Sequence, residues 1–130
     1  MTLLLVEPST LLRERLAAIL ASLGCMEIVE TATYEMASEV IRSLQPMIVI
    51  MDAQLTDGSG LELLSVARVE CPSACLIVVN PSSSEPYRKR WLQAGADHCF
   101  DLSVQIDQLM EVVMHHSQMY VCSIPQRKYQ

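Results

Sequence analysis

The sequence predicts an α/β domain in which a five-stranded parallel sheet, in the order 2-1-3-4-5, is covered by helices on both faces. Short apolar runs alternate five times with segments whose apolar residues recur at helical spacing. The central run, residues 47–51, is apolar throughout, which is typical of a strand buried on both faces. A chain of 130 residues favours a single domain whose core needs no disulfide or metal to be stable.

The first half of the chain predicts strand, helix, strand and helix in that order. Residues 2–6 form the first apolar run, and Ser9 can cap a helix that Gly24 ends. Residues 26–29 predict a second, weaker strand. Thr31 or Thr33 can cap the second helix. The apolar residues expected on the inner faces of these two helices are Leu12, Leu16, Ile19, Leu20, Leu23, Tyr34, Ala37, Val40, Ile41 and Leu44.

Two further helices and a strand follow the central run. Asp52 ends that run, and Ser59 with Glu62 forms a capping-box pair that opens a third helix. Residues 74–79 predict the fourth strand. A second possible capping box, Ser82 with Glu85, opens the fourth helix. The inner residues expected for these two helices are Leu61, Leu64, Ala67, Tyr87, Trp91 and Ala94.

The last strand and helix complete the alternation. Residues 97–100 predict the fifth strand, and Ser103 is the expected cap of a final helix. Its expected inner residues are Ile106, Leu109, Met110 and Val113. The periodicity fades from Met119, so we expect a domain over residues 1–118 and a loosely held tail over residues 119–130.

Five β-α units with right-handed crossovers fit the flavodoxin-like (βα)5 three-layer sandwich. In this strand order the first, third and fourth strands are neighbours. Glu7, Asp52 and Asn80 follow the ends of these strands, so we expect them to meet at one edge of the sheet. Open α/β sheets bind ligands at this edge, so the sequence predicts a site there.

Composition excludes several classes of function. A net charge of −6 argues against a nucleic-acid surface, and no apolar run approaches the roughly 18–20 residues of a membrane span. The start of the chain lacks the basic region of a signal peptide, so we expect a cytoplasmic protein. The five cysteines are scattered without metal-ligand spacing, and we expect buried free thiols rather than a zinc site.

Three stretches resemble the receiver domain of two-component response regulators, the CheY-like family. They are residues 4–8, the block 52–64 and the segment 94–97, and the resemblance extends over about residues 2–118. It implies that Asp52 accepts a phosphoryl group from a sensor histidine kinase. It also implies a signalling module rather than an enzyme.

The same resemblance implies supporting groups that this sequence only partly supplies. Receivers hold Mg²⁺ with two acids after the first strand, and here Glu7 is followed by Pro8. The position of the usual Thr or Ser is Asn80, the position of the aromatic switch residue is Cys99, and the position of the lysine is Leu102. We therefore expect an atypical receiver that binds Mg²⁺ weakly and is impaired in phosphorylation.

Two alternatives stay open at this point. The chain could be a pseudo-receiver, a protein-binding or dimerisation module that uses its fourth helix, fifth strand and fifth helix without phosphate. The candidate residues for that face are Tyr87, Trp91, Met110 and Met114. A flavodoxin-like flavin or nucleotide site is less favoured, because the loop after the first strand has no glycine. The expected partners are a sensor histidine kinase, an effector protein or a second copy, but neither nucleic acid nor a membrane.

Overall fold

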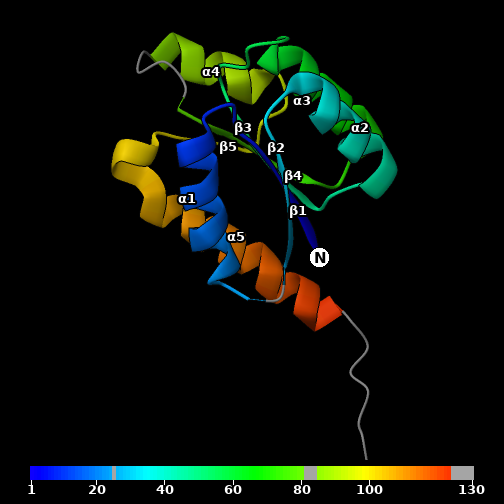
Figure 1. The fold of residues 1–130 in the computed structure, drawn as a ribbon, viewed down its shortest axis with the longest axis vertical. Helices are drawn as coiled ribbons and strands as arrows, with labels where there is room; N and C mark the ends of the chain where they lie inside the picture. Colours follow the sequence, from blue (N-terminus) through cyan, green and yellow to red (C-terminus); the bar gives the residue numbers. More distant parts are fainter. Residues whose placement is uncertain (25, 81–84, 124–130) are drawn as a thin grey trace, which may run out of the picture.

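Five parallel strands form one sheet in the predicted order β2-β1-β3-β4-β5 (Figure 1). The computed structural model describes residues 1–24, 26–80 and 85–123. The strands are β1 (Thr2–Val6), β2 (Glu27–Thr31), β3 (Ile48–Asp52), β4 (Cys75–Val79) and β5 (His98–Phe100). The helices are α1 (Thr10–Ala21), α2 (Tyr34–Leu44), α3 (Gly60–Glu70), α4 (Glu85–Gln93) and α5 (Leu102–Ser123).

Helices cover both faces of the sheet and create two separate cores. On one face α1 and α5 pack over residues such as Leu3, Ile50 and Ile77. On the other face α2, α3 and α4 pack over residues such as Leu4 and Met51. Every residue of β3 and β4 is buried, which explains why both strands, apart from the terminal Asp52, are apolar runs without alternation.

Side-chain caps begin three of the helices where the sequence predicts them. The hydroxyl of Ser9 accepts from the backbone N–H of Leu12 at 3.3 Å, and that of Ser59 accepts from Glu62 at 3.4 Å. Of the two candidates for α2, Thr33 is the cap, accepting from the N–H of Met36 at 3.2 Å. The other, Thr31, ends β2 and is buried.

The start of α5 differs from the prediction. The helix begins at Leu102, and the carboxylate of Asp101 accepts from both the backbone N–H and the hydroxyl of Ser103, at 3.0 and 2.6 Å. The predicted Ser103 cap is therefore wrong, and Asp101 has that role. The first turn is also irregular, because Gln105 has non-helical backbone angles.

Other element boundaries differ by a few residues from those predicted. The second strand is Glu27–Thr31 instead of residues 26–29. Two residues expected on inner faces, Ile19 and Leu44, are 39% and 51% exposed and do not belong to either core. Helix α5 continues to Ser123, whereas the division into a domain and a tail at residue 118 stays a prediction. The predicted Ser82 cap of α4 lies outside the described residues.

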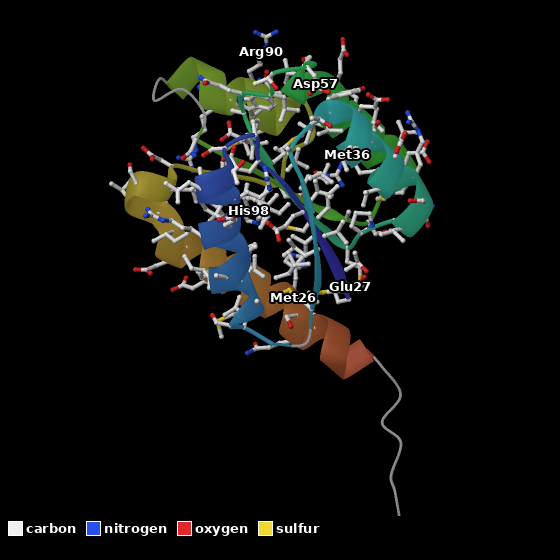
Figure 2. The ribbon with its side chains drawn as sticks, viewed as in Figure 1. Met26, Glu27, Met36, Asp57, Arg90 and His98 are labelled. Atoms are coloured by element: carbon white, nitrogen blue, oxygen red, sulfur yellow. The ribbon has the colours of Figure 1, made fainter. Side chains whose placement is uncertain are left out.

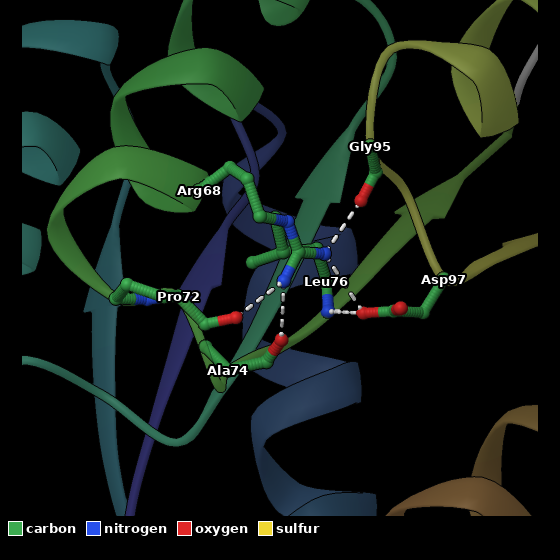
Figure 3. A network of polar contacts seen from close by, with 6 residues as sticks. All are labelled: Arg68, Pro72, Ala74, Leu76, Gly95 and Asp97. Atoms are coloured by element: carbon green, nitrogen blue, oxygen red, sulfur yellow. Dashed lines mark hydrogen bonds and ion pairs between the residues drawn. The ribbon is translucent and has the colours of Figure 1, made fainter.

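A single arginine joins three elements at the amino-terminal ends of β4 and β5 (Figure 3). Arg68 of α3 donates to the carbonyls of Pro72, Ala74 and Gly95, at 3.0, 3.2 and 2.6 Å. It also pairs at 3.1 Å with Asp97, whose carboxylate accepts from the N–H of Leu76 at 2.8 Å. This network fixes the end of the sheet opposite the predicted site.

The described cysteines Cys71, Cys75 and Cys99 are free and buried, in agreement with the expectation from their spacing. Burial is the main cause that raises the pKa of the Cys75 thiol to about 12, so this group is an unreactive part of the core. Within the described residues, no helix has the length and hydropathy needed to cross a membrane.

Candidate functional site

Asp52 is the last residue of β3 and lies at the carboxyl end of the sheet, as predicted. Its strand is hydrogen-bonded between β1 and β4, and Asp52 itself pairs in register with Val79. The side chain is 9% exposed, and its Oδ1 accepts from the backbone N–H of Gln54 at 2.7 Å. The Asp52 carboxylate thus lies at the carboxyl end of the sheet, and one of its oxygens accepts a hydrogen bond from the loop that follows β3.

Glu7 lies beside Asp52, one residue after the end of β1. Its backbone N–H donates to the carbonyl of Thr31 at 3.0 Å, which extends the pairing of β1 with β2. Only 2% of Glu7 is exposed. One oxygen, Oε2, accepts from the N–H of Ser9 at 3.2 Å, while Oε1 is buried without a hydrogen-bond partner among the described residues. A buried, unpartnered carboxylate oxygen is energetically costly unless a proton or a cation accompanies it.

The surroundings of Glu7 favour its neutral form. Burial is the main cause that raises the pKa of Glu7 to about 8, and the proximity and the charge of the Asp52 carboxyl group add to it. The N–H of Ser9 and the charge of Arg13 act in the opposite direction but are weaker. At neutral pH the Glu7 carboxyl therefore retains a proton that it can donate to the carboxylate of Asp52.

Arg13 brings a positive charge close to these acids, and sequence reasoning missed it. From the first turns of α1 its Nη1 donates to the backbone carbonyl of Glu7 at 2.7 Å, and its Nε lies 3.8 Å from a carboxylate oxygen of Glu30. The guanidinium is thus held by partners other than the Glu7 carboxylate. The sequence offered no signal for this contact, because Arg13 falls in an ordinary helical segment.

Asn80 and Leu102 are joined to each other at the ends of β4 and β5. Asn80 has a left-handed backbone (φ 54°), and its Oδ1 accepts from the N–H of Leu102 at 3.1 Å. The Leu102 side chain packs against the core between the sheet and α1 and α5. The side-chain oxygen of Asn80 thus accepts from the backbone of the β5–α5 connection.

Cys99 and the candidate interface residues have very different exposures. Cys99 is 1% exposed in the core beneath α4, where burial raises the pKa of its thiol. Trp91 belongs to the same core and Met110 is half-buried, whereas Met114 is 43% exposed. The side chain of Tyr87 lies outside the part that the structure describes. Of the candidate interface residues whose side chains are described, only Met114 is exposed.

The loop between β3 and α3 also reaches α2, a connection that the sequence did not predict. Asp57 lies at the amino-terminal end of α2 (Figure 2), where its two oxygens accept from the N–H groups of Tyr34 and Glu35 at 2.7 and 3.3 Å. These hydrogen bonds, that of Tyr34 foremost, lower the pKa of Asp57. Asp57 is a loop residue whose carboxylate caps a helix 23 residues away in sequence.

Comparison with known proteins decides the family. The family model described as the response regulator receiver domain matches residues 3–114. The chain belongs to this family. An uncharacterized response regulatory protein of Vibrio cholerae is 32% identical over 99 residues, which are 75% of this chain and 39% of that protein. The chain spans between 30% and 52% of the length of the curated relatives that it matches.

Solved structures show the same fold. A CheY-like receiver domain protein from Methanospirillum hungatei is 25% identical, with a TM-score of 0.81 over 91% of this chain and 94% of the other. The signal receiver domain of a DNA-binding response regulator from Colwellia psychrerythraea is 15% identical, with a TM-score of 0.84 over 91% and 98%. The predicted sheet order and the predicted family are therefore confirmed: this is a response-regulator receiver domain of two-component signalling.

Proposed function

We propose that Asp52 accepts a phosphoryl group from a sensor histidine kinase and that the domain passes this state to an effector protein in the cytoplasm. The observation that carries the proposal is the pair of carboxyl groups, Asp52 and buried Glu7, at the carboxyl end of the sheet. In the transfer, an oxygen of the Asp52 carboxylate attacks phosphorus as the bond from phosphorus to the histidine nitrogen breaks. The nitrogen keeps the electron pair of that bond.

Glu7 and Asp52 fit a magnesium ion, the metal that receiver domains use. Mg²⁺ in phosphoryl-transfer sites is held by one or two carboxylates, with water and phosphate oxygens as the other ligands. The unpartnered Oε1 of Glu7 is an oxygen that a cation would satisfy. Pro8, which follows Glu7, supplies no side-chain oxygen in place of the second acid that the family has, so we infer weak binding. When bound, the ion offsets the charge of the phosphoryl oxygens.

Two other positions support an impaired, atypical receiver. Leu102 places an apolar side chain against the core at the position where the family has a lysine. Asn80 directs its side-chain oxygen to the N–H of Leu102, which leaves only its amide N–H groups to donate to a phosphoryl oxygen. From these substitutions we infer slow phosphorylation. Cys99 is buried and has no aromatic ring, so we infer that it does not act as the switch residue of the family.

The deciding experiment is an intact-mass measurement after incubation with Mg²⁺ and a small-molecule phosphodonor. The parent should gain one phosphoryl group, and Asp52→Asn should gain none, because an amide is a very poor nucleophile. Asp57→Asn is the matched control, since this carboxylate caps α2 and should leave the gain intact. A phosphoryl gain that survives in Asp52→Asn would contradict the assignment of Asp52.

A cation at position 102 should accelerate the reaction. In Leu102→Lys the aliphatic part of the new side chain can keep its packing while the ammonium reaches toward the phosphoryl group. We expect a gain on the order of tenfold in the phosphorylation rate, as a charge a few ångströms from the group contributes about 1–4 kcal/mol. Val104→Lys adds the same charge at a 77% exposed position and should change the rate little. Equal acceleration by both variants would assign the effect to net charge alone.

The alternative is a pseudo-receiver that binds proteins or dimerises without phosphate. The raised pKa of buried Glu7 favours it, because a neutral Glu7 carboxyl is a state of the site that needs neither metal nor phosphate. Its surface would be formed by α4, β5 and α5, where Met114 is exposed. A parent protein that gains no phosphoryl group, but sediments as a dimer that Met114→Lys disrupts, would support this alternative.

A further inference from the structure

Trp91 is the buried residue in the described part of α4. Its side chain is 9% exposed and belongs to the core that includes Met51 and Cys99. Among residues 88–93, the part of α4 whose side chains are described, Trp91 alone is buried. The position of α4 therefore depends on what the indole ring contacts.

The indole ring lies on Gly60, the first residue of α3. A Cβ built on Gly60 would be 2.7 Å from Cη2 of Trp91 and 3.4 Å from Cζ3. The same Cβ would be 3.3 Å from the backbone carbonyl oxygen of Ala53. Because side-chain carbons do not approach this closely, the ring fits only while position 60 has no side chain. Trp91 thus contacts the end of the Asp52 loop, residues 53–60, at Gly60, and the carbonyl of Ala53 at the start of this loop lies beside the same glycine.

A second glycine of the Asp52 loop contacts a different helix. A Cβ on Gly58 would lie 2.9 Å from Cγ of Tyr34, the first residue of α2, which Asp57 also caps. The Asp52 loop therefore contacts α2 through Gly58 and α4 through Gly60. The two contacts are separated by one residue and can be disturbed one at a time.

We propose that Trp91 couples the Asp52 loop to α4, so that a change in the loop moves this helix. The inference rests on the proposed function for its trigger, since a group added to Asp52 would compete with the N–H of Gln54 for the carboxylate oxygen. Packed interiors transmit such displacements because they contain few voids. Cys99 on β5 is buried and has a small side chain, so we expect no comparable coupling through β5.

The two glycines test the coupling without any phosphodonor. In Gly60→Ala the new methyl must displace the indole ring, so we expect a shift of Trp91 fluorescence, the only tryptophan signal, and several-fold faster hydrogen exchange in α4. In Gly58→Ala the exchange should change in the first turn of α2, while α4 and the emission stay as in the parent. Circular dichroism of each variant establishes that the fold is kept. Equal responses of α4 to both substitutions, or none to Gly60→Ala, would overturn the proposal.

A second comparison separates this coupling from a purely structural role of the ring. Trp91→Phe keeps an aromatic core residue but removes the ring edge that reaches Gly60. After treatment with Mg²⁺ and phosphodonor, parent and Trp91→Phe should show the same phosphoryl gain by mass, and only the parent should change its exchange in α4. An equal change in Trp91→Phe would contradict the proposal. If neither gains a phosphoryl group, the proposed function fails, and the glycine pair alone decides the coupling.

Discussion

Replacing Glu7 with Gln should stabilise the domain at alkaline pH by on the order of 4 kcal/mol. In the folded parent the pKa of Glu7 is raised to about 8 from its ordinary 4.5, mainly by burial. Between these values the folded state retains a proton that the unfolded state has lost. The free energy of unfolding of the parent therefore falls as pH rises from about 4.5 to 8. In Glu7→Gln this contribution is absent, because the amide cannot ionise and can still donate to Asp52.

Urea unfolding at intervals from pH 5 to 9, without divalent cations, measures the effect. The two proteins should differ little at pH 5 and most at pH 9. The difference between them is the quantity to use, because the lowered pKa of His116 makes stability rise with pH in the acidic part of the range. Glu14→Gln makes the same change at an exposed position of α1 and should follow the parent. Parallel pH profiles of parent and Glu7→Gln would refute a protonated, buried Glu7.

The architecture was largely predictable because it depends on local signals. Continuous apolar runs marked the buried strands, and short polar residues before helical periodicity marked the caps Ser9, Thr33 and Ser59. The last helix shows the limit of such signals. Asp101 and Ser103 are both good cap residues two positions apart, and only the hydrogen bonds of the folded chain distinguish them.

The site was predictable in outline and not in its electrostatics. Strand order brings Glu7 and Asp52 together, so their proximity follows from topology. The protonation of Glu7 does not follow from topology, because it depends on how the whole fold buries this carboxyl group. Contacts between residues distant in sequence were also missed. Asp57 caps a helix 23 residues before it, and Trp91 rests on a glycine of another helix, without any local pattern to indicate either contact.

The proton on Glu7 also predicts how Mg²⁺ binding depends on pH. A cation that takes Glu7 as a ligand must displace this proton, so the apparent affinity should rise about tenfold per pH unit between pH 6 and 8 and level off above that range. Isothermal calorimetry in buffers of different ionisation enthalpy should report close to one proton released per ion below the pKa of Glu7. Repeating the titration with Trp91 fluorescence gives an independent measure of the same equilibrium.

The controls for this prediction distinguish a ligand from a merely buried acid. Glu7→Gln should bind Mg²⁺ more weakly and lose most of the pH dependence, because an amide holds no proton that the ion must displace. Glu14→Gln should keep both the affinity and the slope of the parent. A slope that persists in Glu7→Gln would assign the displaced proton to another group. Glu7 would then be an acid that the fold buries and neutralises, and a site of this kind favours the pseudo-receiver over the phosphoacceptor.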